Sequence, residues 1–167
     1  MNYSFMSFSC PELNLDDTLA LAVKFGYAGI EPRISQKHKH GIDLDSSPAF
    51  RAECRQKAGK SGVAFACVAT SCTYADPQKR EAMVAETHQA IDLAADIGAP
   101  RIRVFGGGLP GGVTREQAFD LLTASMKAVA GHAAERHVTV CMETHDDWCT
   151  PVHLATVMQR VNHPAIG

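Results

Sequence analysis

The sequence predicts a parallel α/β fold, namely part of a (β/α)₈ barrel of the TIM type, and three observations support it. Short β-prone runs alternate with amphipathic helical stretches five times along the 167 residues, which is the order of a parallel sheet covered by helices. The run Val63–Thr70 is almost entirely apolar, as in strands that are buried on both faces. No linker, charge block or low-complexity stretch divides the chain. An open, doubly wound sheet is the alternative architecture.

The β-prone runs are expected to form strands at residues 3–9, 28–32, 63–70, 101–105 and 138–143. The helices that follow them are expected at residues 15–25, 48–60, 77–97, 115–133 and 151–161. Three of these helices begin with a capping residue and a proline, namely Ser47-Pro48, Asp76-Pro77 and Thr150-Pro151. Thr114 and Gln117 have the spacing of a capping box, and Gly26 stands where a left-handed residue commonly ends a helix.

The length bears on how much of a barrel is present. A complete barrel needs about 250 residues and at least roughly 200, whereas these 167 residues hold five units and the segment Pro164–Gly167, which we interpret as the opening of a sixth strand. We therefore expect residues 1–167 to form one partial barrel domain that is truncated at its carboxyl end. Its edge strands would expose unpaired backbone groups, so pairing with a second copy is a possible outcome.

Composition and charge argue against several classes of partner. The 16 Lys and Arg against 18 Asp and Glu give a net charge of −2, whereas proteins that bind nucleic acid or anionic lipid usually have a basic excess. The longest apolar run, Val63–Ala69, is far shorter than the roughly 20 residues that cross a bilayer. The 6 cysteines form no CxxC pair, and no basic residue precedes Lys24. We expect a cytoplasmic protein with reduced thiols.

Active sites of parallel α/β proteins lie at the carboxyl ends of the strands, and this rule selects a small set of residues. The candidates are Glu31, Arg33, Cys72, Gly106, Glu143, His145 and Trp148. Glu143 and His145 are the expected catalytic pair, because residues two apart in an extended segment share a face. A carboxylate beside an imidazole suits a divalent metal or proton transfer next to a carbonyl.

Each remaining candidate allows a functional and a structural interpretation. Glu31 and Arg33 could contact substrate or pair with each other and with neighbouring strand ends. Cys72 could line a pocket or be an inert buried thiol. Trp148 could stack on a sugar ring or cover the bottom of its loop. The run Lys37–His40 could meet a phosphate or sugar hydroxyls, or form a solvated loop.

The segment Gly106–Gly111 matches the GxGxxG pattern of dinucleotide-binding loops. Pro110 stands where the helix of such a motif begins, yet the capping box starts the helix at Thr114, and the acidic residue expected about 20 positions later is missing. We therefore interpret this segment as a flexible active-site loop, with Gly106 on the substrate side.

Three segments resemble the xylose isomerase-like barrel superfamily, in particular its sugar phosphate isomerase/epimerase branch. They are Gly26–Glu31, Leu93–Pro100 running into Arg103–Gly107, and Val140–His145. The resemblance implies a (β/α)₈ barrel that binds a divalent cation (Mn, Mg, Co or Zn) through residues on strands five to eight. Glu143 matches the first ligand, and the other three would lie beyond Gly167. Where ketose epimerases of this family carry a second glutamate, this sequence has Cys149.

The resemblance implies isomerisation or epimerisation of a small carbohydrate, that is, a sugar, sugar phosphate or hydroxy-ketone. A metal would hold the substrate oxygens and stabilise an enediolate while carboxylates move the proton. Glu143 would be a metal ligand and acid/base; His145, Glu31, Arg33 and Cys72 would be substrate-side groups. With one ligand of four, the fragment alone is expected to be inactive.

Three alternatives stay open. A dehydratase that acts on a cyclic polyol ketone would share the chemistry. The apurinic endonuclease branch of the same superfamily would require histidines after strands two and three. A non-catalytic binding or assembly module would need no metal.

Overall fold

The computed structural model describes residues 1–167 and contains only parallel strand pairs. The strands are β1 (Ser4–Met6), β2 (Gly29–Glu31), β3 (Ala64–Phe65), β4 (Val68–Ala69), β5 (Arg101–Phe105) and β6 (Thr139–Glu143). The helices are α1 (Leu15–Phe25), α2 (Pro48–Ser61), α3 (Arg80–Ile97), α4 (Arg115–Glu135) and α5 (Pro151–Val161). Short 3₁₀ turns, η1 (Ser7–Ser9) and η2 (Asp146–Trp148), follow β1 and β6.

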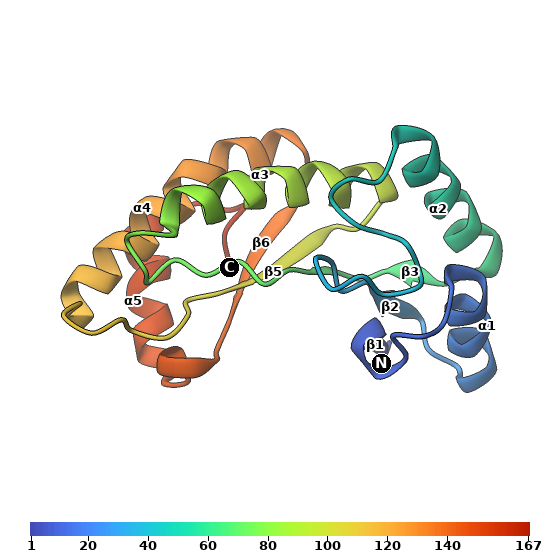
Figure 1. Ribbon diagram of the computed structural model, residues 1–167, viewed down its shortest axis with the longest axis horizontal. Helices are drawn as coiled ribbons and strands as arrows, with labels where there is room; N and C mark the ends of the chain where they lie inside the picture. Colours follow the sequence, from blue (N-terminus) through green and yellow to red (C-terminus); the bar gives the residue numbers. More distant parts are fainter.

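The strands run in chain order across the fold, which confirms the predicted partial barrel. The pairs β1–β2–β3 and β4–β5–β6 form two three-stranded groups, and a bridge between Arg33 and Ala69 joins them. Because β3 and β4 both lie in the predicted strand 63–70, β6 is the fifth of the predicted strands. Beyond it, Ile166 bridges to Val140, as expected for the opening of a sixth strand. Figure 1 shows the helices in an arc outside the strands, with each helix packed against the next. The concave side therefore belongs to the strands alone.

The expected continuous strand 63–70 is wrong in detail, because an extra residue interrupts it. The amide of Ala66 donates to the carbonyl of Ile30, but the next donor to the same neighbour is Ala69, which donates to Pro32. Between these two hydrogen bonds this segment advances by three residues, whereas its neighbour advances by two, which is the geometry of a β-bulge. The interruption separates β3 from β4 and marks the place where the two strand groups meet.

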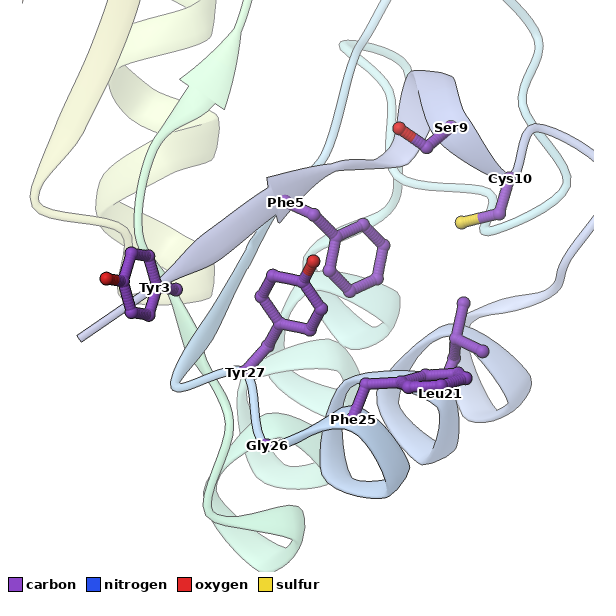
Figure 2. Close-up of a pocket in the computed structure, with 8 residues that line it drawn as sticks. All are labelled: Tyr3, Phe5, Ser9, Cys10, Leu21, Phe25, Gly26 and Tyr27. Carbon is purple, nitrogen blue, oxygen red and sulfur yellow. The ribbon is translucent and has the colours of Figure 1, made fainter.

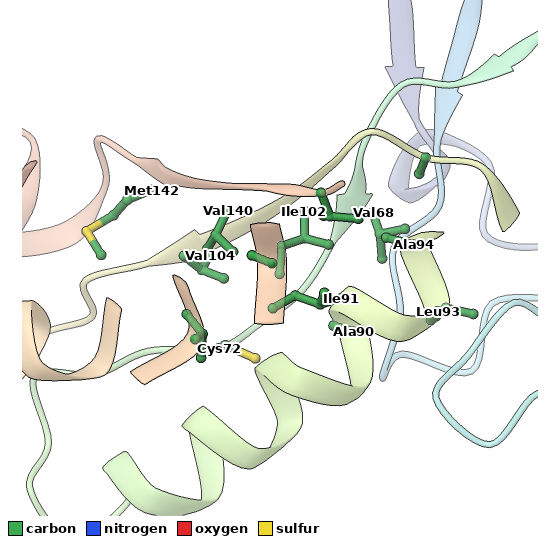
Figure 3. Packing of buried hydrophobic residues seen from close by; sticks show 14 of the residues in the cluster. Val68, Cys72, Ala90, Ile91, Leu93, Ala94, Ile102, Val104, Val140 and Met142 are labelled. Carbon is green, nitrogen blue, oxygen red and sulfur yellow. The ribbon is translucent and has the colours of Figure 1, made fainter. Parts of the chain in front are cut away.

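The buried core lies between the strands and the helix arc. Alternate residues of β5 and β6 point outward to the helices: Ile102, Val104 and Val140 have no exposed surface, and Met142 keeps 8%. Figure 3 shows them against Ile91 and its neighbours on α3. The other residues of the same strands consequently face the concave side.

The helix boundaries follow local capping chemistry in most places. The side chain of Ser47 caps α2, and Thr114 and Gln117 form both hydrogen bonds of a capping box at α4. Gly26 ends α1 with φ of 73°. The expected start of α3 at Pro77 is wrong. Residues 76–79 form a turn, after which the Arg80 amide donates a hydrogen bond to the Asp76 carbonyl at 3.0 Å. The α-helix begins at Arg80.

Candidate functional site

The strand register places one row of residues side by side on the concave face. Arg33 pairs with Ala69, Ala69 with Arg103, and Arg103 with Cys141. The next row toward the carboxyl ends contains Phe105 opposite Glu143. Two cationic side chains and one carboxylate therefore reach the same edge of the sheet.

Arg103 and Glu143 form the centre of this edge. Arg103 Nε lies 3.1 Å from Glu143 Oε2, and Arg103 Nη1 donates to the carbonyl of Thr70 at 3.0 Å. The guanidinium carbon lies 4.1 Å from the centre of the Phe105 ring. Burial lowers the pKa of Arg103 and Glu143 partly offsets this, but a guanidinium remains charged throughout the physiological range. Arg103 thus holds the Glu143 carboxylate, whose side chain stays 42% exposed.

Arg103 is a site residue that the sequence did not predict. The feature of the sequence that could have revealed it is the alternation in β5, where Arg101 and Arg103 alternate with the apolar Ile102 and Val104. In a strand whose outward face is buried, a long cationic residue on the other face has to line the concave side.

His145 lies at the same end of the concave face as Glu143 but has other partners. Its Nδ1 lies 2.7 Å from Asp146 Oδ1, and its ring centre is 4.9 Å from that of Phe105. Because Phe105 is the register partner of Glu143, the two expected catalytic residues share a neighbour without an ion pair between them. Asp146 has φ of 49°, so the left-handed turn after His145 folds this carboxylate back onto the imidazole.

Glu31 and Arg33 do not pair with each other. Glu31 accepts a short hydrogen bond from the Ser4 hydroxyl. Arg33 reaches the Ser71 hydroxyl with Nη2 at 3.4 Å, and its Nε is buried without a hydrogen-bond partner. Its guanidinium lies 5.5 Å from the centre of the Phe8 ring.

Ser7 ties the loop after β2 to the end of β1. Its hydroxyl oxygen accepts from the Arg33 amide at 2.9 Å and lies 3.1 Å from both His38 Nδ1 and His40 Nε2. His40 Nδ1 accepts from the Ile42 amide, so the His40 proton sits on Nε2 and is donated to Ser7. The Ser7 hydroxyl is then left to donate to His38. The Lys37–His40 run is thus anchored by its two histidines and is not simply a solvated loop.

Three of the residues predicted to contact substrate are buried in this structure. Trp148 has no exposed surface, and its Nε1 donates to the carbonyl of Gly107 at 2.8 Å. Gly106 is buried against that indole. Cys72 also has no exposed surface, and Figure 3 shows it within the core. Their burial favours the structural interpretation of each residue.

The loop Gly106–Gly112 is held to the loop after β6 and does not stand free. The Leu109 amide donates to Asp147 Oδ2 at 2.7 Å, and Arg115 Nη1 donates to the Asp147 carbonyl at 2.9 Å. With Trp148 beneath it, this loop forms a fixed wall beside the strand that ends at Glu143.

The residues of this chain fit one ligand position of a metal site. A half-exposed carboxylate oxygen at a strand end suits a hard divalent cation, and Glu143 supplies it. No group of three or more His, Cys, Asp and Glu side chains could hold an ion. A cation at Glu143 would therefore need ligands from outside residues 1–167.

An apolar cavity of about 590 Å³ lies away from this edge. Figure 2 shows it between β1 and α1, lined by Phe5, Leu21, Phe25 and Tyr27 among others. Phe5 points outward, whereas its neighbours Ser4 and Met6 contact Glu31 and Arg103 on the concave side. The cavity and the charged edge consequently lie on opposite faces of β1.

None of the helices combines the length and the apolarity that crossing a membrane requires.

Comparison with known proteins shows to which family the chain belongs. The family model described as "Xylose isomerase-like TIM barrel" matches residues 19–167, and the chain belongs to this family. A search of curated proteins finds no match.

Solved structures share the fold at low sequence identity. The IOLI protein with a bound zinc atom superposes with a TM-score of 0.81 at 14% identity, covering 100% of this chain and 61% of that one. D-psicose 3-epimerase with D-fructose gives 0.80 at 14%, covering 99% and 62%. The probable 3-DHS dehydratase AsbF from Bacillus anthracis gives 0.78 at 17%, covering 99% and 61%. The chain thus spans about three fifths of the length of these structures.

Proposed function

We propose that the protein containing this chain is a metal-dependent isomerase or epimerase that moves a proton at the carbon next to a carbonyl of a small carbohydrate. The observation that carries the proposal is the Arg103–Glu143 pair. It fixes a half-exposed carboxylate at the carboxyl end of β6, on the concave face, with Nε and Oε2 3.1 Å apart. Structural neighbours that include an epimerase and a zinc-containing protein support this choice.

Glu143 has two roles in this proposal, as an oxygen ligand and as an acid/base group. A divalent cation, when bound, supplies positive charge that stabilises the enediolate oxygens of the reacting substrate. Arg103 orients the Glu143 carboxylate through the 3.1 Å contact, and the Phe105 ring packs against the Arg103 guanidinium. His145, 52% exposed and oriented by Asp146, is positioned to meet a substrate hydroxyl.

Calorimetric titration with Mn²⁺ and Zn²⁺ tests the proposal on the purified protein at its natural length. We expect one tight site that Glu143→Gln weakens by about tenfold or more, because losing even a group that only supports a metal ligand costs roughly 10- to 100-fold in affinity. Glu135→Gln, at the far end of α4, is the matched control and should bind as the wild type does. Equal cation affinity in wild type and Glu143→Gln would contradict the proposal, and no affinity in the wild type would favour a binding module.

A dehydratase is the second candidate, since AsbF shares the fold. Both reactions begin by removing a proton next to a carbonyl, but the dehydratase then expels a hydroxyl group. Loss of water from the product, detected by its mass, would favour this candidate over the isomerase.

A further inference from the structure

Arg33 lies near the carboxyl ends of the strands on the concave face and has no ion-pair partner. Arg103, in the same row, is paired with Glu143, whereas Arg33 has only the long contact with Ser71 at 3.4 Å. Its Nε is buried and has no hydrogen-bond partner. A half-buried guanidinium with an unused N–H is unfavourable unless an acceptor completes it.

The charged groups near Arg33 do not provide it with a counter-ion. The register sequence Arg33–Ala69–Arg103 separates the two arginines by a single small residue. Burial first, and then repulsion from Arg33, lower the pKa of Arg103, while Glu143 and Glu31 act against this. Burial and Arg33 likewise lower the pKa of His38. Glu143 is paired with Arg103, and Glu31 accepts from the Ser4 hydroxyl, so neither carboxylate forms an ion pair with Arg33.

The surroundings hold Arg33 in place for such a ligand. Ser7 fixes its backbone through the amide at 2.9 Å, and the Phe8 ring lies against its guanidinium. The free Nε and the weakly engaged Nη2 lie on one edge of the guanidinium, which is the edge that binds two oxygens of one anion. The Ser71 hydroxyl is a further donor beside it.

We propose that Arg33 and Ser71 bind an oxyanion group of the substrate, a phosphate or a carboxylate, at the carboxyl ends of β2 and β4. The inference rests on the proposed function for its location, because it narrows the substrate to an anionic hydroxy-carbonyl compound whose reacting end lies toward Glu143. Arg33 is thus the specificity-determining residue of the site.

Binding of inorganic phosphate and of malonate, measured by calorimetry at low ionic strength, tests the inference without catalysis. We expect one saturable site in the wild type and affinity weakened about tenfold to a hundredfold in Arg33→Gln, the usual effect of losing a charged hydrogen-bond pair. Arg33→Lys should be intermediate, because an ammonium keeps the charge without the two-donor edge. Arg101→Gln, at the opposite end of the concave face, should bind as the wild type does.

The two anions distinguish the sources of the oxyanion. Tighter phosphate binding would indicate a phosphorylated substrate, and tighter malonate binding a carboxylate. No saturable binding of either anion, or equal binding by wild type and folded Arg33→Gln, would overturn the inference.

Glu143→Gln separates this inference from the proposed function. It should abolish proton exchange yet retain phosphate binding, since it removes no contact of Arg33. Arg33-dependent anion binding in a protein without exchange activity would leave the anion site standing and refute the isomerase. Exchange activity without Arg33-dependent binding would do the reverse.

Discussion

Trp148 occupies the space beside Gly106 so completely that residue 106 cannot carry a side chain. A Cβ on Gly106 would lie 2.3 Å from Cδ1 of the indole, and the indole Nε1 is bonded to the carbonyl of Gly107. The loops after β5 and β6 are therefore locked together on either side of the strand end that carries Glu143. The contact is structural, and it fixes one wall of the candidate site.

Gly106→Ala should destabilise the protein by about 1–3 kcal/mol, because the added methyl group overpacks a full core. Urea unfolding followed by circular dichroism measures the free energy of unfolding. Gly111→Ala is the control, since a Cβ there meets nothing within 4 Å. Equal stability of the two variants would show that Trp148 moves aside without cost.

His40 should make the protein sensitive to acid. Burial, and then the nearby His38, lower its pKa from 6.5 to about 4 in the folded state, against weaker opposing effects of the Arg33 backbone and Asp43. Because the folded pKa is depressed, the stability due to neutral His40 is fully present above pH 6.5 and is lost as the pH falls toward 4. The expected slope is at most about 1.4 kcal/mol per pH unit.

Urea unfolding at several pH values between 7 and 4 measures that slope. His40→Gln should be less stable at neutral pH but should flatten the slope, whereas His88→Gln, on α3, should leave it unchanged. A slope that persists in His40→Gln would assign the acid sensitivity to other groups.

Arg103→Gln should raise the affinity of the site for Mn²⁺, because the guanidinium competes with a cation for the Glu143 carboxylate. The expected gain is about fivefold, the size of a half-exposed ion pair, and calorimetry measures it. Arg101→Gln serves as the control for a general change in charge. A lower affinity in Arg103→Gln would contradict this prediction and would mean that the orienting effect of Arg103 on Glu143 outweighs its competition with the cation.

The thiols should differ sharply in reactivity. Cys149 is exposed, whereas Cys54 and Cys72 are buried, and burial raises the pKa of Cys54 to about 11. Ellman's reagent should modify one thiol quickly in the native protein and all 6 after unfolding. Cys149→Ser should remove the fast phase; a fast phase that survives would come from one of the half-buried thiols, Cys10, Cys67 or Cys141, and would contradict the expectation.

Much of the fold follows from the sequence because its signals are local. Ser47 and the Thr114–Gln117 box specify where α2 and α4 begin, and the alternation of β5 specifies which residues face the helices. The carboxyl-end rule also gathers Glu31, Arg33 and Glu143 on one edge, since parallel strands end together.

The rest depends on contacts between distant segments. The bulge between β3 and β4 exists because two neighbours require different register, which no property of residues 63–70 alone reveals. Trp148 could have faced solvent or the core, and only the absence of a side chain at Gly106 decides it. The Arg103 partner of Glu143 likewise lies on another strand.

Exchange of a substrate proton with solvent tests whether Glu143 moves a proton at the carbon next to a carbonyl. The purified protein, supplied with Mn²⁺, would be incubated in D₂O with small ketoses, phosphorylated ketoses and hydroxy-keto acids, and deuterium next to the carbonyl would be followed by proton NMR. We predict incorporation with at least one of these compounds in wild type and Glu135→Gln, and none in Glu143→Gln. Incorporation that is undiminished in Glu143→Gln, or that is absent from the wild type with every compound, would refute proton transfer by Glu143.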